Sequence, residues 1–474
     1  MVKLTGPIVM FDVKDILEAT GGALLTAGSQ GARFSGVSTD TRTLKTEALF
    51  IAIKGLNFDG HNFINEAKLK GAIGAVVSRD FSCRYFPAAD KEMAGFVLIK
   101  VSDTIKALGD IAKFHRKRFN IPIVAVTGSN GKTTTKEMLA VLLAGRYNAL
   151  KNEGTENNLI GASQTLLRLN NNFDIAILEF GTNHFGEIAR LSEIASPSCA
   201  VILNAGYSHL EYFGSVDNVR LEKLSILKQM EGDYFCAVNG DDPALLKGAE
   251  SVCAGAVSFG LGPRCKFRAT SITEDEGRVK FILNEKQKFS LKIPGRHNVH
   301  NALAAIAVGS LLGLEFEDMA RALERFALPK MRMEFVTLSG IRFIFDCHNS
   351  NPSSMACAIE TLSGMGSPGR KILVAGDMLE LGVKGPDFHK EIGRLAARSK
   401  VDMLVGVGPL SRFILDEARN EGVDDESLLH FDNSKEAGKG LKDMFREGDL
   451  VLVKGSRGLK MEEIRRCFTT CCIR

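Results

Sequence analysis

The residues with the clearest chemistry form a glycine-bracketed polar loop between an apolar run and a helical pattern. Its residues are Gly128, Ser129, Asn130, Gly131, Lys132, Thr133 and Thr134. The glycines would let the backbone wrap around an anion, and the helix that follows would direct N–H groups at it. Lys132 adds a positive charge, and the hydroxyl of Thr133 suits the Mg²⁺ of a bound nucleotide. A glycine turn capping a helix is the alternative; we interpret the loop as a nucleotide phosphate loop, although it has two residues between its glycines instead of the common four.

Two more polar groups follow predicted buried strands. Glu179 closes the apolar run 174–180, and His209 follows the run 200–204. Ligands of parallel sheets bind at the carboxyl ends of the strands, so both residues are expected beside the loop. A carboxylate at the end of a buried strand needs a partner, and a metal ion is the expected one, with His209 as a further ligand. The alternatives are a helix cap or an ion pair for Glu179 and a hydrogen-bonded core imidazole for His209.

Two further polar clusters each have a structural interpretation and a ligand-binding one. Asn298 and Asn301 lie on one face at the start of an alanine-rich helix, where they would cap it or bind an adenine edge. The cluster Ser38, Thr39, Asp40 and Arg42 would form a turn or a pocket for an anionic, hydroxyl-rich ligand, and the local sequence favours the turn.

The order of apolar runs and helical patterns predicts an α/β fold of three domains. Residues 1–105 are expected to form a small α/β domain, and residues 106–328 a central P-loop domain with a parallel sheet, to which antiparallel strands are added after residue 233. Residues 329–474 alternate strands and helices, which is typical of a doubly wound, Rossmann-like domain. Its strands are predicted at 343–346, 372–375, 403–407 and 450–453.

Composition limits the class of protein. A chain of 474 residues, 45% hydrophobic and 24% charged, is an ordinary globular protein of several domains, and a net charge of +4 gives no argument for a nucleic-acid partner. Ten scattered cysteines lack zinc-site spacing, which favours reduced thiols in the cytosol. Charges at Lys3, Asp12, Lys14 and Asp15 interrupt the N-terminal region, so no signal peptide or membrane helix is expected and we expect a cytoplasmic protein.

The motifs together resemble the Mur ligase family over nearly the whole chain. The matching blocks are Ser38–Arg42, Asp59–His61, Thr127–Thr135, Glu179–Ile188, Ser208–Glu211, Gly295–Ala305, Arg332–Glu334, Asn349–Pro352, Ala375–Gly382 and Lys454–Arg457. Within the family, the run Gly-Asp-Met-Leu-Glu-Leu-Gly at 376–382 is most specific for the branch that adds D-alanyl-D-alanine to UDP-N-acetylmuramoyl-tripeptide.

This resemblance implies ATP-dependent amide-bond formation through an acyl phosphate, with two Mg²⁺ ions and with those two molecules as substrates. The implied metal ligands are Thr133, Glu179, His209 and, if carbamylated, Lys223. The implied catalytic residues are Lys132, Glu179, His209 and Lys223. The implied nucleotide contacts outside the loop are Asn298, Asn301, Arg332 and Asp346. The implied substrate contacts are Ser38, Thr39, Asp40, Arg42, Asn157, Asn158, Asn349, Asn351, Lys454, Ser456 and Arg457.

Other functions use part of the same residue set. A sister ligase adding a diamino acid is expected to carry an Asp-Asn-Pro-Arg motif in its last domain, and the sequence has none. The first domain favours the Mur branch over a folate polyglutamylating ligase or another amide ligase of the superfamily. A phosphate-loop kinase or nucleotide switch would use Lys132 and Thr133 but would not need the asparagine-rich helix start or a third domain. We expect a monomer.

Overall fold

The computed structural model describes residues 10–26, 31–55, 58–81, 95–230, 232, 234–275 and 277–469. The chain divides into two compact units. The first unit comprises Met1–Ile123, Asn148–Phe180 and Arg190–Pro197, and the second comprises Val124–Tyr147, Gly181–Ala189 and Ser198–Arg474. Within the described ranges, every helix is too short or too polar to cross a membrane.

The first unit contains a small sheet with the strand order β2-β7-β6-β5-β4. Strands β4 to β7 pair in parallel and β2 pairs antiparallel with β7, while a separate antiparallel pair joins β1 to β3. Strands β5, β6 and β7 lie at the apolar runs 49–53, 73–77 and 96–101. The elements are β1 (Phe11–Asp12), α1 (Val13–Thr20), β2 (Ala23–Leu24), β3 (Arg33–Phe34), β4 (Val37–Ser38), β5 (Leu49–Ile51), α2 (Ile64–Leu69), β6 (Gly74–Ser78), β7 (Val97–Val101) and α3 (Thr104–Arg116).

The same unit also holds β9 (Ala149–Lys151), α5 (Leu159–Leu166) and β10 (Ile175–Glu179). Strands β9 and β10 pair in parallel, and α5 packs against α3. Every residue of β10 is buried, as its continuous apolar run predicts. Helix α6 (Glu187–Ala195) continues the chain, with its residues from Arg190 onward in this unit.

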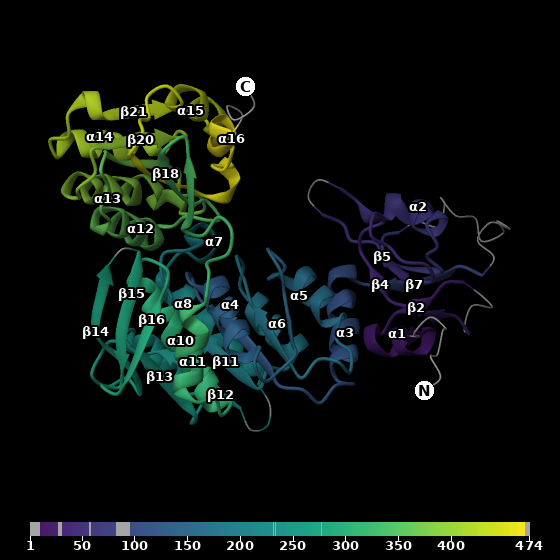
Figure 1. The fold of residues 1–474 in the computed structure, drawn as a ribbon. Helices are drawn as coiled ribbons and strands as arrows, with labels where there is room; N and C mark the ends of the chain where they lie inside the picture. The colour runs from purple at the N-terminus through teal and green to yellow at the C-terminus, as the bar shows by residue number, and fades with distance from the viewer. Residues whose placement is uncertain are drawn as a thin grey trace. The chain divides into compact units, whose positions relative to one another are not determined.

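The second unit contains strands of the central domain in the order β16-β15-β14-β13-β12-β11-β8. Strands β8 and β11 to β14 are parallel, and β15 and β16 continue antiparallel, which confirms the predicted addition. Figure 1 shows β14 to β16 as long neighbouring arrows. The elements are β8 (Ile123–Thr127), α4 (Lys132–Leu143), β11 (Cys199–Ile202), α7 (Leu210–Phe213), α8 (Val216–Leu224), β12 (Phe235–Asn239), α9 (Pro243–Glu250), β13 (Ala256–Gly260), β14 (Phe267–Asp275), β15 (Arg278–Leu283), β16 (Gln287–Leu291), α10 (His297–Leu311) and α11 (Phe316–Glu324).

The C-terminal sheet of the second unit has the order β17-β18-β22-β19-β20-β21, with only β17 antiparallel. Its elements are β17 (Glu334–Leu338), β18 (Ile341–Asp346), α12 (Pro352–Gly364), β19 (Lys371–Gly376), α13 (Gly385–Arg398), β20 (Met403–Val407), α14 (Ser411–Asn420), β21 (Leu428–Phe431), α15 (Ser434–Leu441), β22 (Leu450–Lys454) and α16 (Glu463–Thr469).

Helices cover both faces of this C-terminal sheet (Figure 1). Ile344 of β18 packs in one core with α12, α13 and α14. Its neighbours Phe343 and Phe345 pack in the opposite core with α15 and α16. Successive strand residues point to opposite faces, so this division is the one expected of a doubly wound domain. The structure therefore confirms the α/β class and the doubly wound C-terminal domain.

Candidate phosphate-loop site

Gly131 shows why the phosphate loop needs a glycine. It is the N-cap of α4 with φ 85°, and a Cβ atom there would lie 2.2 Å from Oδ1 of Asn301. Asn301 is buried beneath the loop, where its Oδ1 accepts a hydrogen bond from Oγ1 of Thr135 at 3.4 Å. Only a residue without a side chain fits between Asn301 and the first turn of α4. Asn301 of α10 therefore supports the loop from below.

The Asn298 and Asn301 side chains do not cap α10. Nδ2 of Asn298 donates to the carbonyl oxygen of Pro294 at 2.7 Å, and Nδ2 of Asn301 donates to Oδ1 of Asn298 at 3.0 Å. The N-cap of α10 is Arg296, whose side chain makes no capping bond, so the capping interpretation is wrong. The asparagine pair instead links the turn before α10 to the phosphate loop. A contact of this pair with the nucleotide stays a prediction.

The residues after β11 brace the loop from the side. The backbone N–H of Asn130 donates to Oδ1 of Asn204 at 2.9 Å, and Nδ2 of Asn204 donates back to the Asn130 carbonyl oxygen at 3.1 Å. Oγ of Ser129 lies 2.8 Å from Oγ of Ser208. Nζ of Lys132 donates to the Gly128 carbonyl oxygen at 2.9 Å. The loop is thus held in shape by its neighbours, which is what a preorganised anion site requires.

Two side chains of the C-terminal domain reach the phosphate loop. Nη2 of Arg332 donates to Oγ1 of Thr133 at 2.7 Å. Nδ2 of Asn351, the N-cap of α12, donates to Oδ1 of Asn130 at 2.8 Å, and Nδ2 of Asn130 donates to Oδ1 of Asn351 at 3.3 Å. The structure therefore brings both predicted residues of the last domain to the predicted loop.

A third contact between the same two domains joins His209 to Glu380. Nδ1 of His209 lies 2.5 Å from Oε2 of Glu380, and this hydrogen bond lowers the pKa of Glu380 despite its partial burial. The backbone N–H of Glu211 also donates to the Glu380 carbonyl oxygen at 3.1 Å. Glu380 has no predicted role as a site residue, although it follows a strand of the doubly wound sheet and lies in the run 376–382 that carries the resemblance.

Lys454, Asp346 and Asn349 lie together at the carboxyl ends of the C-terminal strands. Lys454 is almost fully buried, and its Nζ donates to Oδ2 of Asp346 at 2.6 Å and to the Asn349 carbonyl oxygen at 3.1 Å. Oδ1 of Asp346 accepts from the backbone N–H of Met333 at 3.3 Å. The structure therefore brings these three predicted site residues together, with the buried lysine charge balanced by the aspartate.

Ser456 and Arg457 differ from each other in surroundings. Oγ of Ser456 accepts a hydrogen bond from the backbone N–H of Leu379 at 2.9 Å, so this buried hydroxyl supports the loop after β19. Nη1 of Arg457 is exposed and pairs with Oε1 of Glu462 at 2.7 Å. Substrate contacts of both residues stay predictions.

Lys223 lies within α8 and is buried, with a side chain that is 1% exposed. Burial, together with the nearby positive charge of Lys132, lowers its pKa to about 7. In the described part of the chain, Lys223 forms no ion pair with a carboxylate, although the charges of Glu222 and Glu187 act to raise its pKa. The adjacent Glu222 instead accepts from the backbone N–H groups of Gly186 and Ile188, both at 2.8 Å. The lowered pKa makes the neutral amine more accessible at neutral pH than in an exposed lysine, and only a neutral amine can add CO₂.

Glu179, in the first unit, is buried at the end of β10. Its Oε1 accepts from Nδ2 of Asn157 at 2.8 Å, and its backbone N–H donates to Oδ1 of Asn152 at 2.9 Å. Asn158 is the N-cap of α5 and accepts from the Gly161 N–H at 2.9 Å. The residues after β9 therefore hold the end of β10. Asn152 was not among the predicted site residues, because a lone asparagine in a loop gives no signal in the sequence.

The Ser38–Arg42 segment forms a self-contained turn in the first unit. Oγ of Ser38 donates to the Asp40 carbonyl oxygen at 3.0 Å, and Nη2 of Arg42 donates to Oδ2 of Asp40 at 2.6 Å. The Arg42 hydrogen bonds lower the pKa of Asp40 to about 2. Oγ1 of Thr39 accepts from Nε2 of Gln164 at 2.5 Å. The locally favoured turn is present, and a ligand pocket there stays a prediction.

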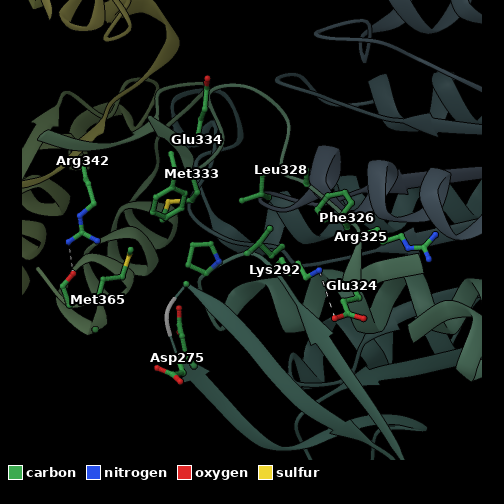
Figure 2. A pocket seen from close by; sticks show the side chains of 18 residues that line it. Asp275, Lys292, Glu324, Arg325, Phe326, Leu328, Met333, Glu334, Arg342 and Met365 are labelled. Atoms are coloured by element: carbon green, nitrogen blue, oxygen red, sulfur yellow. Dashed lines mark hydrogen bonds and ion pairs between the residues drawn. The ribbon is translucent and has the colours of Figure 1, made fainter. Parts of the chain in front are cut away.

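A cavity of about 1050 Å³ lies where the central and C-terminal domains are joined within the second unit (Figure 2). None of the predicted site residues lines it. Its lining includes the end of β14, residues 292–294 after β16, the connecting segment 324–328, residues 333–335, Arg342 and residues 364–366. Figure 2 shows Leu328, Met333 and Arg342 around the cavity. Nη2 of Arg342 donates to the Gly366 carbonyl oxygen at 2.7 Å.

The predicted metal donors are not a cluster of acidic residues, histidines and cysteines. Among the described residues, no group of three or more His, Cys, Asp or Glu could hold an ion. The predicted donors are instead the Thr133 hydroxyl, the Glu179 carboxylate, the His209 imidazole and Lys223. Mg²⁺ prefers oxygen donors, and it is commonly held by one or two protein side chains together with water and nucleotide phosphates. A hydroxyl and a buried carboxylate fit that preference.

Three family models match the chain in the order of its domains. Residues 33–116 match the model described as Mur ligase family, catalytic domain, and residues 126–309 match the Mur ligase middle domain. Residues 331–457 match the model described as Mur ligase, glutamate ligase domain.

Two proteins of related sequence carry the same name. The UDP-N-acetylmuramoyl-tripeptide--D-alanyl-D-alanine ligase of Bacillus subtilis is 36% identical over 454 residues, which cover 95% of this chain and 97% of the relative. The ligase of the same name from Escherichia coli is 34% identical over 94% of this chain and 96% of its own.

Solved structures agree with these relatives. A crystal structure of MurF from Acinetobacter baumannii is similar with a TM-score of 0.86 at 29% identity, over 98% of this chain and 100% of the other. MurF ligase from Thermotoga maritima in complex with ADP has a TM-score of 0.79 at 26% identity, over 92% and 97% of the two chains. Because relatives this similar cover nearly the whole sequence, and the three domain models follow one another along it, the chain belongs to the Mur ligase family.

Proposed function

We propose that the chain is an ATP-dependent ligase that joins D-alanyl-D-alanine to UDP-N-acetylmuramoyl-tripeptide, a step in the synthesis of peptidoglycan precursors. The observation that carries this function is the direct contact of the C-terminal domain with the phosphate loop, through Arg332 on Thr133 and Asn351 on Asn130. A kinase or nucleotide switch needs a phosphate loop but no second domain upon it. A ligase needs the second domain, because the amine must reach an acyl group activated at the nucleotide.

ATP is the proposed nucleotide. The backbone of residues 128–134 and Lys132 would hold its phosphates, and the Thermotoga maritima relative was solved with ADP. Further contacts are assigned to four residues that lie around the loop and at the C-terminal strand ends, namely Asn298, Asn301, Arg332 and Asp346. Arg332 would exchange its hydrogen bond to Thr133 for one to a phosphate oxygen, since guanidinium binds phosphate well.

Two Mg²⁺ ions are proposed, held by Thr133, Glu179, His209 and carbamylated Lys223. Bound Mg²⁺ neutralises charge on the transferring phosphoryl group. The protein's own contribution is to place donors in a rigid frame: the Asn204 contacts shape the loop, and Asn152 and Asn157 hold Glu179. Carbamylation of Lys223 is supported by its burial and by its pKa of about 7, since CO₂ adds to the neutral amine and leaves an oxygen donor.

The reaction has two covalent steps. The terminal carboxylate of the tripeptide attacks the γ-phosphorus of ATP, which releases ADP and leaves an acyl phosphate. The amine of D-alanyl-D-alanine then attacks the acyl carbon, loses a proton, and displaces phosphate through a tetrahedral intermediate. Lys132 and the N-terminus of α4 balance the negative charge of the transferring group, which is most of what phosphoryl transfer requires of a protein.

The domains divide the substrates between them. The turn of Ser38, Thr39, Asp40 and Arg42, with Asn157 and Asn158, is assigned to the nucleotide-linked tripeptide. The group at the C-terminal strand ends is assigned to the dipeptide, and its residues are Asn349, Asn351, Lys454, Ser456 and Arg457. We place the domain boundaries at 1–105, 106–328 and 329–474, with a hinge near Leu328. The enzyme is proposed to act as a cytoplasmic monomer.

Phosphate release tests this function. The purified protein is incubated with ATP, Mg²⁺, UDP-N-acetylmuramoyl-tripeptide and D-alanyl-D-alanine, and each component is omitted in turn. Phosphate release that requires both the acyl and the amine substrate supports the ligase. Release that occurs with a diamino acid and the shorter peptide precursor supports the sister activity, and release without any amine supports a kinase or a nucleotide switch. Using tripeptides with different diamino acids identifies the preferred third residue.

A further inference from the structure

We propose that Glu380 is a positioning residue that fixes the ring orientation and tautomer of His209, so that His209 is ready for the nucleotide site only when the C-terminal domain contacts the central one. The inference rests on the proposed function, in which His209 serves the nucleotide site. It concerns a carboxylate that lies in the C-terminal domain and an imidazole that lies in the central domain.

The first observation is the contact itself. Nδ1 of His209 and Oε2 of Glu380 are 2.5 Å apart. An ionised carboxylate can only accept a hydrogen bond, so Nδ1 of His209 carries the proton. In a neutral imidazole, Nε2 then has the lone pair. In the described part of the chain, His209 makes no other side-chain hydrogen bond. Carboxylates that accept from one nitrogen of an imidazole commonly fix its tautomer and orientation for the other nitrogen.

The second observation is that the loop bearing Glu380 is built rigidly. Three consecutive residues before it are each held by a hydrogen bond. The N–H of Ser411 donates to Oδ1 of Asp377 at 2.7 Å, the N–H of Met378 donates to Nε2 of His389 at 3.0 Å, and the N–H of Leu379 donates to Oγ of Ser456 at 2.9 Å. The rest of the loop therefore does not need the Glu380 side chain for its shape. A rigid support is what placing a distant imidazole requires.

The third observation is backbone strain on both sides of the contact. Glu380 has φ 63° and His209 has φ 53°, and both lie in the left-handed region that residues with a Cβ rarely adopt. Strained residues persist where the surrounding structure determines them, and they cluster at functional sites. Here two such residues face each other from different domains.

The fourth observation connects His209 to the phosphate loop. Ser208, its neighbour in the chain, lies 2.8 Å from Ser129 of the loop through their Oγ atoms. A displacement of His209 is therefore transmitted through one peptide unit to a side chain of the loop. Contact of Glu380 with His209 can thus couple the position of the C-terminal domain to the phosphate loop.

The test compares Glu380→Ala and Glu380→Gln with Glu426→Ala, a matched replacement of an exposed glutamate in the same domain. Histidine-labelled, nucleotide-free protein is measured by long-range ¹H–¹⁵N NMR at pH 8, and the signal of His209 is assigned by its loss in His209→Gln. We expect the Nδ1–H tautomer in the native protein and in Glu426→Ala, and a shift towards Nε2–H in Glu380→Ala. Glu380→Gln can still accept the hydrogen bond and should keep part of the native tautomer population.

Kinetics provide the second readout. Glu380→Ala should lower kcat by roughly 10–100-fold, as for other residues that orient a ligand, while Glu426→Ala stays within twofold of native. In a His209→Gln background, Glu380→Ala should have little further effect. An unchanged His209 tautomer in Glu380→Ala, or full activity of that variant, overturns the inference. The tautomer is measured without substrates, so it decides the role of Glu380 even if the native protein shows no ligase turnover.

Discussion

Asn130 of the phosphate loop and Asn351 at the start of α12 exchange side-chain hydrogen bonds at 2.8 and 3.3 Å. The backbone of Asn130 is at the same time held by Asn204. The loop is therefore fixed on one side by its own domain and on the other by the C-terminal domain. An amide pair suits this position because each side chain both donates and accepts.

Asn351→Ser should weaken the interdomain contact without unfolding α12, because serine is also a good N-cap. We expect the loss of about 1 kcal/mol of interaction free energy, seen as a several-fold higher KM for D-alanyl-D-alanine and faster proteolysis of the segment near Leu328. In a double-mutant cycle, Asn130→Ser should add little to Asn351→Ser. The control is Asn433→Ser, which alters the N-cap of α15 with the same type of cap bond. Equal effects of the two serine replacements would show that only capping had been lost.

Lys132→Ala should abolish turnover while the protein stays folded. The amine contacts the loop through the Gly128 carbonyl oxygen and is placed to balance phosphate charge. Loss of one preorganised charge partner of a transition state costs roughly 10²–10³-fold in kcat or more. Circular dichroism and substrate-dependent phosphate release are the measurements, with Lys435→Ala as an exposed lysine control. Near-normal turnover would refute the assigned role.

Lys223 should carry a carbamate in the active protein. Protein incubated with ¹³C-bicarbonate is expected to show a carbamate resonance in ¹³C NMR that is absent in Lys223→Met and present in the exposed control Lys228→Met. Activity of Lys223→Met should fall by about 100-fold, because an oxygen donor is lost from the proposed metal site. A resonance that persists in Lys223→Met would place the carbamate elsewhere.

His297 should make the protein sensitive to acid. Burial lowers its pKa from 6.5 to about 4, so between these pH values the unfolded chain binds a proton that the folded chain does not. Stability therefore falls as pH drops through this window, by about 1.4 kcal/mol per pH unit, and is unaffected by this group above pH 6.5. Calorimetry at pH 7 and pH 5 should show a smaller loss of Tm for His297→Gln than for native protein. The control variant His184→Gln replaces an exposed histidine, and its Tm should fall between pH 7 and pH 5 by as much as that of the native protein.

Sequence patterns were sufficient for the elements with continuous or periodic apolar residues. The fully buried strands β8, β10 and β20 lie where their runs predict them. Within the C-terminal sheet, β17 and β21 were not predicted, and neither has such a run. β17 is an edge strand without a fully buried residue, and β21 buries only Leu428. Their position depends on pairing with strands distant in sequence, which a local pattern does not contain.

In the candidate site, too, features set by the local sequence could be predicted, whereas contacts between residues distant in sequence could not. The phosphate loop could be predicted because Gly131 and Lys132 meet local backbone and charge requirements. The support of the loop by Asn301, and of His209 by Glu380, joins residues more than 160 positions apart in each case. Such pairs form only when the domains fold. A lone asparagine or glutamate therefore gave little indication of its partner.

The cavity beside the linker segment 324–328 has a consequence for inhibition. It is lined by both the central and the C-terminal domain, so its dimensions must change whenever the angle between them changes. A compound bound between Leu328, Met333 and Arg342 would hold the central and C-terminal domains at one fixed angle. It would not need to resemble ATP, the sugar nucleotide or the dipeptide. Its potency would not fall as substrate accumulates, because it would compete with none of them.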